Sequence, residues 1–260
     1  METKKMIINE ATGLAKNVYE DVAQPVLSEV GKTAGGITRV LLSPLNGIVW
    51  GFDKIIEKIE EEVSIKLSKT PNDKKQTPPA FIAVPAIEAL RYTAEIDDLR
   101  NLYNNLIANA MDADTVGSVH PSFVDILKNL TPDEAKLLGT FLERDSVPFV
   151  DVRSISNKLT RAFSTVEKYH SHVVEDYNLE LTYVCKLPIY FDNLLRIGIL
   201  SATDQYTLED EHYIKLEQCK NVMKLKGEIE SEGEIFETKR GFFALTNFGR
   251  EFINVVIRNK

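Results

Sequence analysis

The sequence contains only two cysteines among its 260 residues, and this scarcity excludes several classes of protein. Cys185 and Cys219 are far apart, with no second cysteine near either. A disulfide framework and a C-x-x-C redox or zinc motif are therefore excluded, and the composition fits a reducing cytoplasm. The phosphate-binding loops G-x-x-x-x-G-K-[ST] and G-x-G-x-x-G and the G-x-S-x-G nucleophile motif are also absent. No motif indicates an enzyme, and we expect no catalytic residue, cofactor or metal site.

A hydrophobic run suited to crossing a membrane is also lacking. The least polar stretch, residues 33–52, has about the length of a spanning helix and only Arg39 as a charge, but Pro44 and four glycines interrupt it. We therefore expect a buried hairpin of two short helices there. Trp50 and Phe52 are residue types that settle at a membrane interface, so contact with a membrane surface is the alternative.

Neither sign of charge dominates the composition. There are 31 Lys and Arg residues against 39 Asp and Glu residues, which gives a net charge of −8. The hydrophobic fraction of 43% and the charged fraction of 27% are typical of soluble globular proteins. The negative balance argues against DNA phosphates or anionic lipids as the dominant partner.

Helical periodicity is the main pattern over the first two thirds of the chain. Apolar residues recur every three or four positions in residues 55–67 and 84–111, with a joint expected near Thr93. The intervening residues 69–79 contain three prolines and are expected to form an exposed linker. Thr131, followed by Pro132 and Glu134, predicts a capped helix start. We expect an N-terminal helical segment with a Gly-rich apolar hairpin over residues 1–70 and a central helical domain over residues 71–180.

The last part of the chain, residues 181–260, has the pattern of a winged-helix-like module. Two helical stretches precede two strand-like stretches, at 229–238 and 241–246, and a closing helix. The expected fold class is therefore mainly α, α+β overall: an N-terminal multi-helix bundle followed by a C-terminal winged-helix-like module with a two-stranded hairpin. Residues 227–237 hold five carboxylates and no basic residue, so the wing would be repelled by DNA.

The histidines and paired carboxylates form no recognisable metal motif. His170 and His172 would point the same way only on a strand, and we expect them to be a solvated surface pair. A histidine could activate Cys185 or Cys219 only through tertiary proximity, which no flanking signature indicates. Asp112 and its neighbour two residues on lack a calcium-binding loop.

Six segments of the sequence resemble the abortive infection alpha family, a bacterial family linked to phage defence. They are SPLNGIVWGFDKI from Ser43, PPAFIAVPAIEALRYT from Pro78, LRNLYNNLIANAMD from Leu99, HPSFVDILKNLTPDEAKLL from His120, YFDNLLRIGIL from Tyr190 and LTNFGREFI from Leu245. The resemblance spans most of the chain and implies a role in antiviral defence, in which an infected cell stops growing or dies before phage is released. It brings no catalytic residues with it.

The family segments also supply candidate interaction residues. For each candidate, the alternative is a structural role in packing or helix capping. For His120, that alternative is a hydrogen bond to the backbone at a helix start. Arg91 and Asp112 are the stronger functional candidates, because both are charged residues within these segments. The full set is Trp50, Asp53, Arg91, Tyr92, Asp112 and His120.

We expect a cytoplasmic protein that confers phage resistance by recognising a phage or host protein rather than by catalysis. One alternative is a membrane-perturbing effector that acts through residues 31–52 and is peripheral to the inner membrane. Another is a winged-helix DNA-binding regulator that uses residues 186–260. Homo-oligomerisation is compatible with all three hypotheses.

Overall fold

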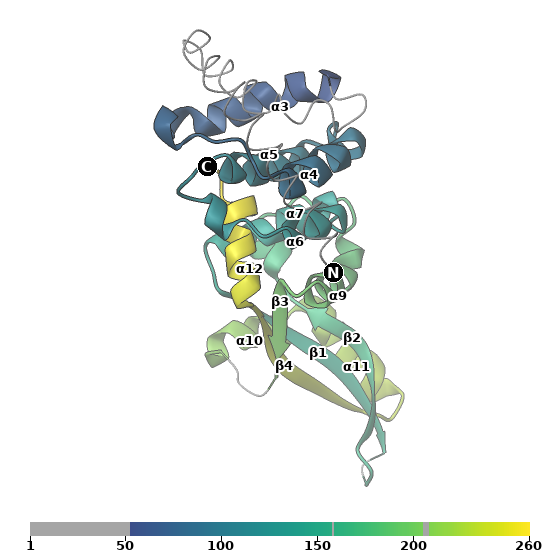
Figure 1. Cartoon of the computed structure of the whole chain (residues 1–260). Helices are drawn as coiled ribbons and strands as arrows, with labels where there is room; N and C mark the ends of the chain where they lie inside the picture. Colours follow the sequence, from purple (N-terminus) through teal and green to yellow (C-terminus); the bar gives the residue numbers. More distant parts are fainter. Residues whose placement is uncertain (1–52, 158, 205–207) are drawn as a thin grey trace, which may run out of the picture. The chain divides into compact units, whose positions relative to one another are not determined.

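The computed structural model describes residues 53–157, 159–204 and 208–260 (Figure 1). Trp50 and the apolar stretch at residues 31–52 lie outside this part of the chain. Tertiary contacts divide the chain into two compact units, residues 1–128 together with 259–260, and residues 129–258. The division after residue 128 differs from the boundaries that the sequence pattern suggests near residues 70 and 180.

The described part of the first unit is helical. α5 contacts each of the other three helices, and the core that they share contains the fully buried side chains of Leu90, Tyr103 and Phe123. The joint expected near Thr93 is confirmed, since one helix ends there and the next begins four residues later. The elements are α3 (Asp53–Lys66), η2 (Leu67–Lys69), η3 (Asn72–Lys74), α4 (Ala80–Thr93), α5 (Asp97–Ala110), η4 (Val116–Ser118) and α6 (Ser122–Lys128).

The segment expected to be an exposed linker, residues 69–79, is instead attached to the end of α5. Lys75 forms an isolated antiparallel bridge with Asp112, and the Gln76 amide donates to the carbonyl of Met111 at 2.9 Å. Its prolines end helices and favour turns, as expected, but backbone hydrogen bonds hold it within the first unit.

The second unit combines helices with one antiparallel sheet. Its four strands are β1 (Ser146–Asn157), β2 (Ala162–His170), β3 (Leu200–Thr203) and β4 (Ile235–Leu245), in the order β2-β1-β4-β3. The helical elements are α7 (Pro132–Gly139), η5 (Thr140–Leu142), α8 (Val173–Asp176), η6 (Val184–Lys186), α9 (Leu187–Arg196), α10 (Asp210–Glu217), α11 (Lys220–Ser231), α12 (Asn247–Phe252) and the π-helical turn η7 (Ile253–Ile257).

Helices cover both faces of this sheet, because successive strand residues point to opposite sides. Val150 and Val152 of β1 pack with buried side chains of α10 and α11. On the other face, Phe149 contacts Phe243 of β4, and Phe243 stacks on Phe191 of α9 with ring centroids 3.9 Å apart. The central strand β1 is therefore buried on both sides.

The expected fold class is wrong, and the chain is mixed α/β. Residues 229–238 do not form the first strand of a hairpin, since α11 continues to Ser231. β4 instead runs through both expected strands from Ile235 to Leu245 and pairs with β1 and β3. Local periodicity reveals a strand but not its partner, and β1 lies far upstream of β4 in the sequence. The described residues therefore contain neither a winged helix nor its hairpin.

None of the described helices is both long enough and apolar enough to cross a bilayer.

The close approach of α12 to the chain before β3 provides a test of this packing. Gly249 is buried, and a methyl group there would overlap the carbonyl oxygen of Ile199. We expect Gly249→Ala to lower the free energy of unfolding by about 1–3 kcal/mol, as overpacking does. The matched control is Gly227→Ala on the exposed side of α11, where the added methyl meets open space and should raise stability by about 0.5–1 kcal/mol. Urea unfolding of both variants is the measurement, and equal effects would contradict the packing.

Candidate functional site

A groove of about 820 Å³ lies in the second unit, lined by the start of α7, residues 182–186 and α9. Its rim carries apolar side chains that are open to solvent. Tyr183 is 56% exposed and Ile189 is 62% exposed, and the neighbouring Val184 is also exposed. Because large apolar side chains are rarely left this open together, the rim marks a candidate interaction surface.

The buried carboxylate of Asp133, in the first turn of α7, organises the floor of the groove. It accepts hydrogen bonds from the amides of Thr182 and Tyr183, both at 2.9 Å, and from the hydroxyl of Tyr190 at 2.8 Å. The residues that line the groove are therefore joined to α7 and to one another, although they are distant in sequence.

The ionisation of this floor follows from its contacts. Burial alone would raise the pKa of Asp133, but the bonds from the two amides and from Tyr190 outweigh it and lower the pKa. Burial, and then the hydrogen bond to Asp133, raise the pKa of Tyr190 to about 12. The carboxylate thus stays ionised and the phenol protonated at neutral pH, so neither group is poised to exchange protons.

A second set of bonds ties α9 to the capped end of α7. The expected capping box is confirmed, with Thr131 and Glu134 bonded to each other's backbone amides. Asn193 donates from Nδ2 to Oε1 of Glu134 at 2.7 Å and to the carbonyl of Asn129 at 2.9 Å. The groove is therefore a preformed feature.

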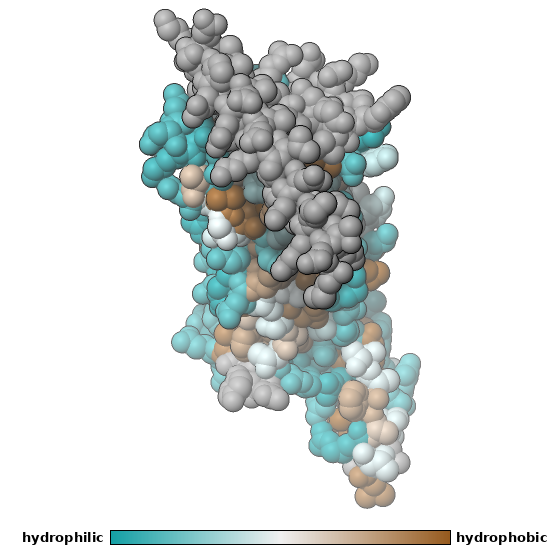
Figure 2. Space-filling view, in the orientation of Figure 1, coloured by the Kyte–Doolittle hydropathy of each residue, from teal (hydrophilic) through white to brown (hydrophobic). Residues whose placement is uncertain are grey.

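Exposed apolar side chains also lie on the two faces of the β1–β2 hairpin. Leu159 is almost fully exposed, and Phe163 and Val166 are about half exposed. Figure 2 shows apolar residues among hydrophilic ones around this hairpin. The guanidinium of Arg153 covers the ring of Phe163 at 4.3 Å, so this ring is partly screened from solvent.

A family model described as abortive infection alpha matches residues 51–256 of the chain. The protein belongs to the abortive infection alpha family. The family name indicates a role in abortive infection, a form of phage defence. No curated protein matches the chain. It is similar to a solved uncharacterized protein from the hydrocarbon-degrading marine bacterium Alcanivorax borkumensis SK2, at 16% identity and a TM-score of 0.37, over 52% of this chain and 92% of that one.

The described candidate residues of this abortive infection alpha protein lie in the first unit, on α3, on α4, after the end of α5 and before α6. Trp50 lies outside the described residues, and Asp53 is the first residue of α3. Arg91 and Tyr92 lie in the last turn of α4, where both are exposed, Tyr92 by 84%. An exposed aromatic ring beside a guanidinium is a composition that protein contacts favour.

Asp112 is only 6% exposed and is engaged within the first unit. Its Oδ2 accepts from Lys260 Nζ at 2.7 Å and from the hydroxyl of Thr70 at 3.0 Å, and its Oδ1 accepts from the amide of Asp114 at 2.9 Å. Burial raises the pKa of Asp112, but the bond from Lys260 and then those from Asp114 and Thr70 lower it by more, so the net shift is downward. These contacts hold the end of α5, residue 70 and residue 260 together.

His120 is exposed and accepts a hydrogen bond at Nδ1 from the amide of Ser122 at 3.1 Å. The expectation that this side chain serves the backbone at a helix start is confirmed, since α6 begins at Ser122. Asp112 is buried and His120 is exposed, and each has its own bonding partners.

The structure also brings together three residues that we did not expect to meet. His170, His172 and Cys219 offer ligand atoms that all lie within 4.8 Å of one another. The histidines are partly buried rather than a solvated pair. No local signal in the sequence could have joined them, because the contact depends on how β2 and the α10–α11 corner meet on the sheet.

The buried ion pair of Asp112 gives a prediction about acid stability. We expect Asp112→Asn to lower the free energy of unfolding at neutral pH by about 3 kcal/mol, because it leaves Lys260 without its charged partner. The lowered pKa means that the ionised carboxylate stabilises the fold above its ordinary pKa, and that this contribution is lost as pH falls through the lowered value. Urea titrations should therefore show the difference from wild type shrinking as pH falls below the ordinary range of an aspartate pKa. Asp114→Asn, which breaks an exposed ion pair with Lys74, is the control and should change little at any pH.

Proposed function

We propose that this abortive infection alpha protein acts in phage defence by binding a phage or host protein in the groove between α7 and α9. The observation that carries the proposal is the exposed apolar rim, Tyr183 and Ile189, over a hydrogen-bonded floor. Binding energy at protein interfaces is concentrated in a few apolar or aromatic anchors seated in pockets. The expected ligand is therefore a protein segment that inserts an apolar side chain.

The preformed floor supports recognition over catalysis. Because Asp133 is saturated by three hydrogen bonds, binding does not need to order the groove first, and less conformational entropy is lost on association. The same saturation leaves this carboxylate poorly placed to act as a general base, which must reach the proton that it removes.

The charges around the groove favour a protein over a polyanion. The lining holds two basic residues, Lys186 and Arg196, against three acidic residues, Asp133, Glu134 and Asp192. Asp192 also accepts from Lys168 Nζ at 2.8 Å. Phosphate binding requires a surplus of positive charge, which this lining does not have. The hypothesis of a DNA-binding regulator also loses the winged helix on which it was based. The hypothesis of a membrane effector concerns residues 31–52, outside the described part of the chain.

Expression in a phage-sensitive bacterium tests the proposal. Wild-type protein is expected to reduce plaque counts relative to an empty vector for at least one phage in a diverse panel. Ile189→Asp places a charge on the groove rim and should raise plaque counts back toward the empty vector, because a buried unpaired carboxylate opposes docking. The measurement is the efficiency of plating at matched protein levels.

Ile214→Asp is the matched control, since Ile214 is an exposed isoleucine on a helix of the same unit but away from the groove lining. It should protect as wild type does. Equal loss of protection in both variants, or full protection by Ile189→Asp, would refute the groove as the binding surface. Wild-type protein that protects against no phage would refute the defence function itself.

A further inference from the structure

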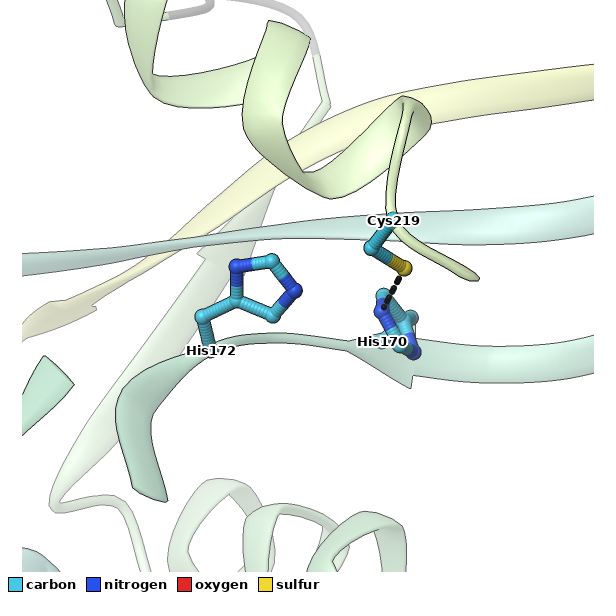
Figure 3. Close-up of side chains that lie close together, drawn as sticks. All are labelled: His170, His172 and Cys219. Atoms are coloured by element: carbon cyan, nitrogen blue, oxygen red, sulfur yellow. Dashed lines mark hydrogen bonds between the residues drawn. The ribbon is translucent and has the colours of Figure 1, made fainter. Parts of the chain in front are cut away.

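The second unit contains a cluster of metal-ligating side chains that the proposed function does not use (Figure 3). His170 Nε2 lies 3.1 Å from Cys219 Sγ, and the rings of His170 and His172 are 5.6 Å apart between centroids. The two histidines come from the end of β2 and the residues after it, and Cys219 comes from the corner between α10 and α11.

A bulge in β2 places His170 on the same side of the sheet as this corner. In the pairing with β1, Val152 is opposite Glu167 and Val150 is opposite His170, so β2 has one residue more than β1 over the same interval. The extra residue is accommodated at Tyr169, whose φ of 59° lies in the left-handed region. Residues three apart on a regular strand point to opposite faces, whereas here Glu167 and His170 share one face.

That face is the one covered by α10 and α11. Directly paired residues of an antiparallel ladder lie on the same side, so Glu167 and His170 lie on the side of Val150 and Val152. Cys219 packs against the cluster that contains those two valines. The backbone of Tyr169 has a left-handed conformation, which a non-glycine residue rarely adopts. This conformation therefore helps to bring the His170 imidazole to the Cys219 thiol.

Glu167 sets the proton position on His170. Its carboxylate lies 2.6 Å from His170 Nδ1, and a carboxylate can only accept a hydrogen bond, so Nδ1 carries the proton. In the neutral imidazole, Nε2 then presents its lone pair toward Cys219 Sγ. A carboxylate bonded to the far nitrogen of a ligating histidine is the usual outer contact of protein metal sites.

We propose that His170 Nε2, His172 and Cys219 Sγ bind one transition-metal ion of the zinc class, with Glu167 orienting the first ligand. Two imidazoles and one thiolate suit Zn²⁺ in charge and softness, and three protein ligands leave a fourth position for water or another ligand. Binding displaces the proton of the Cys219 thiol to solvent. The three ligands lie outside the groove lining, so metal binding and protein binding can be tested separately.

The spacing of the ligand atoms fits a tetrahedral ion. Zinc–nitrogen bonds of about 2.1 Å and zinc–sulfur bonds of about 2.3 Å place neighbouring ligand atoms roughly 3.4–3.6 Å apart. The largest separation in the cluster is within 4.8 Å, and the His170–Cys219 pair is already closer than a tetrahedral edge. Side-chain rotations that move the ligand atoms by about an ångström would bring all three within bonding distance of one ion.

The same thiol and imidazole also have the spacing of a nucleophile and its base. Two observations favour the metal. A nucleophile–base pair has no use for the second imidazole of His172, whereas a metal requires it. The 310 Å³ cavity beside the cluster is lined by His172 but not by Cys219, so it does not lead a substrate to the sulfur.

Metal titration of the full chain tests the proposal. After treatment with a chelator, wild-type protein is expected to take up one equivalent of Zn²⁺ in competition with a chromogenic chelator, and Co²⁺ is expected to give a thiolate-to-cobalt absorption band. Cys219→Ser and His172→Ala should lose the equivalent and the band. Glu167→Gln should weaken zinc binding by about 10–100-fold, as loss of an outer contact does.

Cys185→Ser and His212→Ala are the controls, because both residues are exposed and lie outside the cluster. Both variants should bind zinc as wild type does. Absence of zinc uptake by wild type, or unchanged uptake by Cys219→Ser, would overturn the proposal.

A measurement on the wild-type protein gives a result that does not depend on whether the variants fold. Alkylation by iodoacetamide, followed for each cysteine by mass spectrometry, should slow at Cys219 when Zn²⁺ is added and stay unchanged at the exposed Cys185. If Zn²⁺ has no effect and Cys219 reacts faster than Cys185, the cluster is an activated thiol and the metal proposal is wrong.

Discussion

The pairing of β1 with β4 is the interaction on which the second unit depends. The two strands run antiparallel over ten paired positions, and the residues they join are separated by most of the unit's sequence. Because both faces of β1 are buried, the aromatic layer under α9 and the aliphatic layer under α10 and α11 form only when this ladder is in register. Joining β1 to β4 closes a long loop, and local contacts do not offset the conformational entropy that this costs. The ladder and both layers are therefore expected to form together.

Buried carboxylates perform the same structural task in each unit. Asp112 joins residues 70 and 260 to the end of α5, and Asp133 joins residues 182–190 to the start of α7. In both cases hydrogen bonds overcome the cost of burial and keep the charge on the carboxylate. A buried carboxylate that lacks some of its hydrogen bonds destabilises the fold. Each network therefore specifies one arrangement of chain segments that are distant in sequence.

The groove and the histidine–cysteine cluster lie on different elements of the second unit and suit different roles. The groove has an exposed apolar rim and a saturated polar floor, which suits reversible docking of a protein. The cluster has partly buried soft and borderline ligands with an oriented imidazole, which suits an ion. A metal there would strengthen the contact between the end of β2 and the α10–α11 corner, which the His170–Cys219 pair already makes.

The sequence by itself determined the local features and the family. Apolar spacing and helix signals correctly indicated the joint near Thr93 and the capped start of α7, because these depend on neighbours along the chain. It could not supply the partner of a strand. Its pattern predicts a local hairpin of residues 229–238 and 241–246, whereas the structure has one strand, Ile235–Leu245, in a four-stranded sheet. Only the tertiary structure decided that Asp112 contacts Lys260 and that Cys219 contacts His170. The first contact depends on the return of residue 260 to the end of α5, and the second on strand register and a bulge in β2. None of these features produces a periodic pattern in the sequence.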